Sequence, residues 1–158
     1  MPATDLAGSR LLHDARTLGV ATHGGAAPLV CASHLPQAHL LKGVIGRDQP
    51  VVELWRGRDE AHDEIIGATH CRFNGEVLFA TVSVIVSDHG NDALGAATYT
   101  AYRSLLDALQ VTGYPHLLRI WNSIPGINVD DGGLERYRRF NLHRYKAYAE
   151  SKRPTESG

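Results

Sequence analysis

An Asn-Gly dipeptide between two β-rich runs constrains the fold of this 158-residue chain more than any other feature. Asn74-Gly75 separates residues 64–72 from residues 76–86. Asn and Gly readily adopt the positive φ angles that a tight hairpin turn needs, so the pattern predicts two long antiparallel strands. In the second strand we expect the core face to carry Leu78, Ala80, Val82, Val84 and Val86, and the opposite face, which includes Phe79, to be covered at least in part.

From residue 92 onward the apolar residues recur every three or four positions instead of every second position. Asn91 or Asp92 can cap a helix over residues 92–110, and Gly113 suits its end. The apolar row that predicts this helix comprises Leu94, Ala97, Ala101, Leu105 and Leu109. A second helix is predicted from residue 134 to about residue 149, with one face made of Leu134, Tyr137, Asn141, Tyr145 and Tyr148.

Shorter strands complete the pattern. We expect strands within the first 45 residues, at 18–21 and 29–32, another at 51–55, and one at 116–124. The order β-β-β-β-α-β-α predicts an α+β domain in which two helices pack on one face of a mixed sheet. Residues 1–150 are expected to form this single domain, and residues 151–158 a polar tail.

Composition excludes several classes of function. Lys and Arg number 16 against 17 Asp and Glu, so no overall field attracts nucleic acid or an anionic membrane. The glycines at 24, 25, 43 and 46 form no phosphate-binding loop and no dinucleotide fingerprint. No run approaches the roughly 20 apolar residues of a membrane span. The first residues lack an apolar export segment, so we expect a soluble, cytoplasmic protein with reduced thiols.

The cysteines and histidines do not predict a metal site. Cys31-x-x-His34 and the pair His70-Cys71 are the candidates, but no second ligand pair has the spacing of a structural zinc site. His70 and Cys71 would also project to opposite faces of a strand. We therefore predict neither a metal nor another cofactor.

The most distinctive sequence lies around the second predicted helix. Residues 119–128 read RIWNSIPGIN, and residues 133–141 read GLERYRRFN. This sequence resembles the chorismatase family, whose usual form reads WNYIP-x-IN and then GLERYR-x-FN-x-GR. Ser123 stands where the family commonly has tyrosine, and His143 where a glycine usually precedes the last arginine, here Arg144. A weaker resemblance extends back through residues 97–109 and 73–79, and so covers about two-thirds of the chain.

The resemblance implies a fold and an activity. Chorismatases open the enolpyruvyl ether of chorismate and are two-domain proteins with a YjgF-like, chorismate-mutase-like fold, with their main catalytic groups chiefly in the second half. This chain would correspond to the amino-terminal half. It would lack the last strands of a YjgF-like domain, so we expect a second polypeptide to supply strands and an acid.

The chemistry of such a substrate selects candidate residues within the motif. Opening an enol ether begins with protonation of its methylene carbon by a buried carboxylic acid, for which Glu135 is the candidate. Chorismate also carries two carboxylates, which the planar fork of Arg binds better than Lys does. The candidate substrate-binding residues are Arg119, Trp121, Asn122, Asn128, Arg136, Asn141 and Arg144.

A structural interpretation competes with each of these roles. Glu135 would pair with Arg139 at i,i+4, Trp121 and Phe140 would be core residues, and the two asparagines would satisfy turn backbone. Residue by residue this interpretation is the more common one. As a set, the segment concentrates more polar groups at a strand end than packing requires.

Three functions follow from these observations. The first is a chorismatase-type subunit that releases pyruvate with a second polypeptide. The second is a self-associating YjgF-like enzyme acting on an imine, an enamine or another small intermediate, as a symmetric trimer. The third is a non-catalytic structural or ligand-binding subunit. An exposed sheet edge favours association in all three, as a homo-oligomer or with a second YjgF-like subunit, and we prefer the first.

Overall fold

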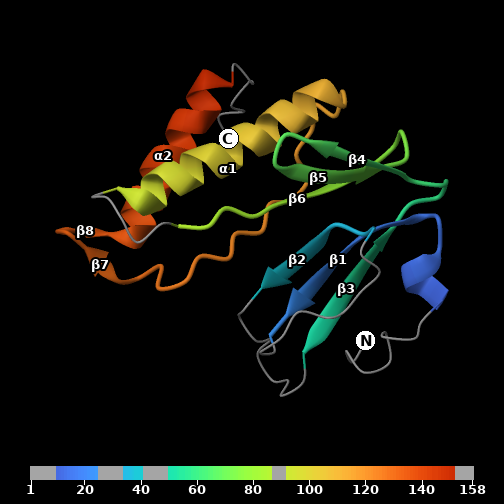
Figure 1. The fold of residues 1–158 in the computed structure, drawn as a ribbon, viewed down its shortest axis with the longest axis horizontal. Coiled ribbons are helices and arrows are strands. Elements are labelled where there is room, and N and C mark those ends of the chain that lie inside the picture. The colour runs from blue at the N-terminus through green and yellow to red at the C-terminus, as the bar shows by residue number, and fades with distance from the viewer. Residues whose placement is uncertain (1–9, 25–33, 41–49, 87–91, 152–158) are drawn as a thin grey trace. The chain divides into compact units, whose positions relative to one another are not determined.

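The computed structural model describes residues 10–24, 34–40, 50–86 and 92–151 (Figure 1). These residues form a short 3-10 helix, eight strands and two α-helices. In chain order the elements are η2 (Arg10–His13), β1 (Thr17–His23), β2 (Gln37–Leu40), β3 (Val51–Arg56), β4 (His62–Ile66), β5 (Thr69–Phe73), β6 (Leu78–Val82), α1 (Ala93–Val111), β7 (Asp130–Asp131), β8 (Leu134–Glu135) and α2 (Arg136–Glu150).

The chain divides into two compact units, which are described separately. The first unit comprises Met1–Ile66, His70–Thr81 and His116–Ser123, and the second comprises the remaining ranges, Gly67–Thr69, Val82–Pro115 and Ile124–Gly158. The predicted α+β class is confirmed. The strands form two small sheets, ordered β2-β1-β3 and β4-β5-β6, rather than one sheet, and a two-stranded ribbon β7-β8. The single domain over residues 1–150 and the packing of both helices on a sheet stay predictions.

The first sheet is mixed, because β1 pairs parallel with β2 and antiparallel with β3. Val20 lies opposite Leu54 in this sheet, and Thr22 lies opposite Val52. Leu12 and Leu35 pack with this face to make a small apolar core. The predicted strands at 18–21 and 51–55 are therefore confirmed, whereas the one at 29–32 lies outside the described residues.

The predicted turn at Asn74-Gly75 is also confirmed. Gly75 has a φ of 86°, and the Asn74 N–H donates to the Val77 carbonyl over 3.3 Å. The Asn74 side-chain oxygen accepts a hydrogen bond from the Val77 N–H at 2.9 Å. This turn joins β5 to β6, which are neighbours in the second sheet.

The lengths and the buried face of the predicted hairpin strands are wrong. A turn at Gly67, whose φ is 59°, divides the first run into β4 and β5, and β6 ends at Val82 so that residues 83–86 are not a strand. Leu78 and Ala80, on the face expected to be the core, are only half-buried, while Phe79, on the face expected to be covered at least in part, is 6% exposed. The reason is that Phe79 packs among other aromatic rings, as described below.

Helix α1 has the predicted extent, and Gly113, with a φ of 77°, follows its end. The Tyr114 N–H donates to the Leu109 carbonyl at 3.0 Å, which satisfies one of the last carbonyls of the helix. Leu94 and Leu109 are buried as expected, but Ala97, Ala101 and Leu105 are half-buried, and the remaining buried side chains are Thr98, Tyr102, Leu106 and Ala108. The buried stripe includes Tyr102 because its ring packs on Phe140 and Tyr148 of α2.

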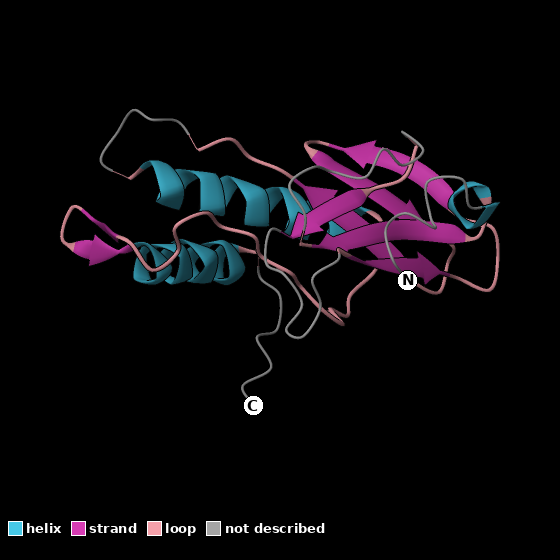
Figure 2. Ribbon diagram, turned by 90° about the horizontal axis from the view of Figure 1, so that it is seen from below, coloured by secondary structure: helices cyan, strands magenta, loops and turns pink. Residues whose placement is uncertain are grey.

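Helices α1 and α2 lie side by side (Figure 2). The Phe140 ring on α2 meets the Tyr102 ring on α1 with centroids 6.0 Å apart and planes at 61°. Phe140 is buried, so its predicted core role is confirmed. The face predicted for α2 is wrong, because Tyr137 and Tyr145 on that face are exposed while Phe140 and Ala147 are buried.

The predicted strand at 116–124 is not formed. Residues 114–124 are neither helix nor strand, and neither described three-stranded sheet includes them. Pro115 removes a backbone donor near the start of this segment. Among the described helices, none has the length and apolar character to cross a membrane.

Candidate functional site

The predicted site residues divide between the two compact units. Arg119, Trp121 and Asn122 belong to the first unit. The second unit holds Asn128, Glu135, Arg136, Asn141 and Arg144. The surroundings of each set are therefore described by themselves.

An aromatic cluster surrounds Trp121 in the first unit. Its ring meets Trp55 of β3 edge-on, with centroids 5.6 Å apart and planes at 79°, and meets Phe79 of β6 at 6.2 Å. Trp55 and Phe79 also contact each other, at 6.2 Å. Gly19, opposite Trp55 in the sheet, makes room for this packing, because a Cβ there would lie 2.2 Å from a Phe79 ring carbon. The half-buried Trp121 is therefore packed against two aromatic rings, one from β3 and one from β6.

A row of charged and polar side chains borders the aromatic cluster. The Arg119 guanidinium lies over the Trp121 ring, 5.3 Å from its centroid, and its Nη1 is 4.0 Å from a Glu53 carboxylate oxygen. The other Glu53 oxygen is 3.3 Å from His23 Nε2. Glu53 and Trp55 share a face of β3 because they are two residues apart. The sheet thus presents a carboxylate and an imidazole beside indole rings.

Arg119 is able to bind an anion from this position. Its side chain is 57% exposed, and the contact with Glu53 lies at the outer limit of an ion pair. Stacking on Trp121 restricts the orientation of the guanidinium plane. A planar carboxylate could take the two donors of this fork at the edge of the indole ring. Asn122, the next candidate, is exposed.

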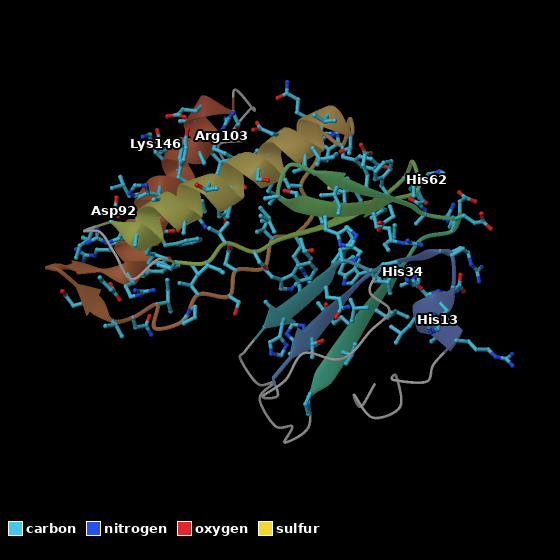
Figure 3. All side chains as sticks on the ribbon, viewed as in Figure 1. His13, His34, His62, Asp92, Arg103 and Lys146 are labelled. Carbon is cyan, nitrogen blue, oxygen red and sulfur yellow. The ribbon has the colours of Figure 1, made fainter. Side chains whose placement is uncertain are left out.

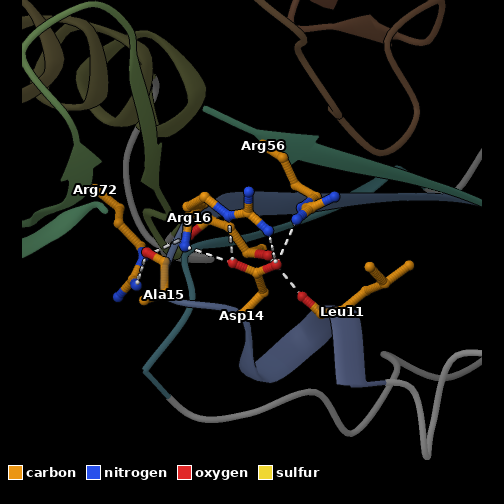
Figure 4. Close-up of polar contacts among 7 residues, drawn as sticks. Leu11, Asp14, Ala15, Arg16, Arg56 and Arg72 are labelled. Atoms are coloured by element: carbon orange, nitrogen blue, oxygen red, sulfur yellow. Dashed lines mark hydrogen bonds and ion pairs between the residues drawn. The ribbon is translucent and has the colours of Figure 1, made fainter. Parts of the chain in front are cut away.

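A second charged cluster fixes the beginning of β1 (Figure 4). Asp14 accepts hydrogen bonds from the Arg16 backbone N–H at 2.9 Å and Nε at 3.0 Å, and it pairs with Arg56 at the end of β3. The hydrogen bonds from Arg16 hold the pKa of the Asp14 carboxyl well below its usual range. The buried Arg72 donates to the Thr17 carbonyl at 2.6 Å. Because the arginines of this cluster donate to Asp14 and to a backbone carbonyl, we interpret the cluster as structural.

The acid candidate lies at the junction of β8 and α2 in the second unit. Glu135 occupies the position that precedes the first residue of α2, with a φ of −57° and a ψ of 135°, and is half-buried. The following residue, Arg136, is half-buried, and its backbone N–H donates to the Val129 carbonyl at 2.9 Å. Asn128 is exposed and lies in the turn over residues 125–128, which precedes β7.

The two remaining candidates lie on α2. The Arg144 guanidinium lies over the Phe140 ring, 5.4 Å from its centroid. Asn141 is half-buried, and its side-chain oxygen is buried without a hydrogen-bond partner among the described residues. A buried acceptor of this kind accepts readily from a donor that a ligand or another chain supplies.

A charged cluster that the sequence did not predict links α1 to α2. One Asp92 oxygen is 2.9 Å from Arg139 Nη1, and the other is 2.7 Å from His143 Nε2. Figure 3 labels Asp92 at the start of α1. The predicted capping position of Asp92 is confirmed, but its side chain makes no capping hydrogen bond and instead holds the two α2 residues. Gly95 makes room, because a Cβ there would lie 2.4 Å from His143 Nε2.

Sequence reasoning also missed His23 and Glu53. Glu53 interrupts the otherwise apolar run at 51–55, and such a charge in a strand was the available signal. The pairing of β1 with β3 that brings His23 near it is a long-range contact with no local sequence pattern. The contact between His143 and Asp92 could not be predicted either, although His143 departs from the usual family sequence.

Cys71 is not an activated nucleophile. Its side chain is buried, and burial, together with nearby Glu64 and Asp63, raises the pKa of the thiol to about 11. The thiol therefore stays protonated near neutral pH, and the thiolate is the nucleophilic form. Within the described parts of the chain, no group of three His, Cys, Asp or Glu side chains could hold a metal ion. Cys31 lies outside the described residues.

Comparison with protein families identifies the class of this chain. The family described as "Chorismatase FkbO/Hyg5-like, N-terminal" matches residues 53–158, which include both motif segments and most of the elements described above. The match extends over more than half of the chain. The chain therefore belongs to the chorismatase FkbO/Hyg5-like N-terminal family.

Individual relatives agree with this assignment. The chain is 31% identical over 102 residues to 3-hydroxybenzoate synthase of Streptomyces hygroscopicus, and 31% identical over 105 residues to chorismatase of Streptomyces rapamycinicus. A chorismatase crystal structure matches 90% of the chain with a TM-score of 0.62 and 27% identity. The chain spans 28% and 29% of the two curated relatives and 43% of the crystal structure's chain.

Proposed function

We propose that this protein is a chorismatase-type subunit that acts on chorismate or a similar cyclic enol-ether carboxylate and releases pyruvate together with a second polypeptide. The observation that carries this proposal is the family match over residues 53–158, which includes both motif segments. The similarity to two curated relatives, a chorismatase and a 3-hydroxybenzoate synthase, supports it.

The surroundings of Arg119 support a role in binding the substrate. An exposed guanidinium stacked on an indole ring offers a directional fork to a carboxylate and an apolar surface to a ring. Glu53 would release Arg119 at little cost, because their contact is long and partly exposed. The other predicted binding residues, Asn122, Asn128, Arg136, Asn141 and Arg144, remain candidates.

The reaction needs an acid that is protonated near neutral pH. Protonation of the methylene carbon gives an oxocarbenium ion, water adds to it, and the resulting hemiketal collapses to pyruvate and the ring alcohol. Glu135 is the candidate acid in the motif, but it is only half-buried. We expect a second polypeptide to cover Glu135 or to supply a different, buried acid.

The test is an assay of pyruvate release from chorismate by the purified chain, alone and after co-expression with the product of the neighbouring reading frame. Release that requires the partner supports a split chorismatase. Arg119→Lys keeps the charge but removes the fork, so it should raise KM more than tenfold. Arg103→Lys is the matched control, because Arg103 is paired with Asp107 along α1. A well-folded complex that releases no pyruvate refutes the proposal.

A non-catalytic, ligand-binding subunit is the second candidate. It is favoured by the buried side-chain oxygen of Asn141, which has no hydrogen-bond partner among the described residues and is suited to accept from a bound ligand or another chain. Such a subunit would bind the partner and a carboxylate without turnover. Calorimetric binding of chorismate by a complex that releases no pyruvate would support it.

A further inference from the structure

Glu53 is a charged residue on β3, where every other residue except the terminal Arg56 is apolar. In the first sheet it lies opposite Ala21 of β1, whose side chain offers no polar group. Its ion pair with Arg119 is long, at 4.0 Å, and both side chains are partly exposed, so the pair adds little to the stability of the fold. A strand position of this kind is better filled by a β-branched or aromatic residue. The fold itself therefore gives little reason for a carboxylate here.

The Glu53 carboxylate keeps its capacity to accept hydrogen bonds. Its Oε1 is 3.3 Å from His23 Nε2, a buried nitrogen without a hydrogen-bond partner among the described residues, so this contact is an ion pair and not a hydrogen bond. Its Oε2 is 4.0 Å from Arg119 Nη1, which is also too far for a hydrogen bond. The Glu53 side chain is 36% exposed, and a carboxylate accepts at both oxygens. A ligand can therefore donate to it.

Arg119 and Glu53 place hydrogen-bond donors beside an acceptor. The Arg119 fork suits a carboxylate, whereas Glu53 accepts from a hydroxyl and repels a second negative group. The Trp121 ring under the guanidinium adds an apolar surface for a ligand ring. With its two charged groups 4.0 Å apart, the site can distinguish ligands by the group that they carry near their carboxylate.

We propose that Glu53 determines the specificity of the Arg119 site and selects ring compounds that carry a hydroxyl group near the carboxylate. In this arrangement the ligand carboxylate takes the Arg119 fork, and the ligand hydroxyl donates to Glu53. A second carboxylate in place of the hydroxyl would face the Glu53 charge and bind poorly. The inference rests on the role proposed above for Arg119, and it adds the class of ligand, a cyclic hydroxy-carboxylate.

The first test measures binding to the unchanged chain by NMR titration of the indole N–H signals. The chain has two tryptophans, Trp55 and Trp121, and both lie in the aromatic cluster, so both signals report on this site. The probes are cyclohexanecarboxylate, its cis-3-hydroxy derivative and cis-cyclohexane-1,3-dicarboxylate, which differ only in the group that would face Glu53. Because the new hydrogen bond is to a partly exposed carboxylate, the hydroxy acid should bind about fivefold more tightly than the unsubstituted acid, and the dicarboxylate should bind most weakly.

Glu53→Gln tests the cause of this order. The change removes the negative charge and keeps the size of the side chain, so the preference for the hydroxy acid should fall below about twofold, and the dicarboxylate should no longer be the weakest ligand. Glu64→Gln is the matched control, because it makes the same change of charge at an exposed position of β4 in the same unit. It should keep the original order of affinities. Circular dichroism checks that both variants are folded.

Three results would overturn the inference. They are equal affinity of the unchanged chain for the hydroxy acid and the unsubstituted acid, an unchanged order of affinities in Glu53→Gln, and no shift of either indole signal with any probe. The second of these is the result expected if Glu53 is only a solvated surface charge. Binding is measured here without turnover, so the expected order of affinities together with no release of pyruvate by the complex would refute the proposed function alone.

Discussion

Substitution of Gly95 by alanine tests the charged cluster between α1 and α2. On the bare helix this change would be favourable, because Ala exceeds Gly in helix propensity by at most about 1 kcal/mol. In the folded protein the new Cβ would lie 2.3 Å from an Asp92 oxygen and 2.4 Å from His143 Nε2. Since contacts under 3 Å do not occur, the Asp92 and His143 side chains have to move.

The expected net effect is a loss of stability. Displacing side chains in a packed contact costs about 1–3 kcal/mol. The hydrogen bonds between Asp92 and its two partners weaken as well, by about 1 kcal/mol after allowance for the half-exposed Asp92. After the gain in helix propensity, Gly95→Ala should lower the free energy of unfolding by about 1–3 kcal/mol, or the Tm by about 2–4 °C per kcal/mol.

A double-mutant cycle with His143→Ala isolates the cause. Without the imidazole, the remaining close contact is with the Asp92 oxygen that Arg139 also holds, so part of the cost stays. Gly95→Ala should then cost less than in the unchanged chain, and the cycle should give a coupling of about 1–2 kcal/mol. The measurement is urea unfolding followed by circular dichroism. Equal effects of Gly95→Ala in both backgrounds would refute the reasoning.

Three further predictions concern the first unit. Gly19→Ala should lower the free energy of unfolding by about 1–3 kcal/mol, because its Cβ would meet the buried Phe79 ring; thermal melts test this, and an unchanged Tm would contradict it. The pKa of Asp14 is lowered in the folded state, so its contribution is present above the unfolded value of about 4 and is lost as pH falls below it. Between pH 6 and pH 2 the Tm of the unchanged chain should therefore fall more than the Tm of Asp14→Asn. If the Tm of both proteins falls equally with pH, the pairing of Asp14 with Arg16 does not stabilise the fold. Cys71, with a pKa raised to about 11, should resist iodoacetamide at pH 8 until the chain unfolds, as mass spectrometry of the modified peptide would show.

Local patterns predicted the positions of elements better than their buried faces. The Asn74-Gly75 turn and the extent of α1 depend on residues close in sequence, and both are confirmed. The buried side of α1 depends on what packs against it. A row of apolar residues that includes Ala97 and Ala101 fitted the helical period, but the Tyr102 ring, outside that row, makes a contact with α2.

The strand predicted at residues 116–124 is not formed, and the reason is a different one. A strand is a relation between two segments, and propensity describes only one of them. The segment has strand propensity, yet no described sheet includes it. The same limit applies to the candidate site. Arg119 and Trp121 could be selected from the motif, whereas Glu53 lies near Arg119 through a contact between β3 and residues far along the chain, and His23 lies near Glu53 through the pairing of β1 with β3.

The departure at position 143 is explained by its surroundings. The usual family sequence has glycine where this chain has His143, and a glycine there could make no contact with the Asp92 carboxylate. Here the imidazole takes one Asp92 oxygen, Arg139 takes the other, and Gly95 provides the space. Four residues from two segments far apart in the sequence thus support one contact between α1 and α2. The Nε2 atom of His143 is occupied by Asp92. We therefore interpret His143 as a residue that holds the two helices together, not as a replacement in the substrate site.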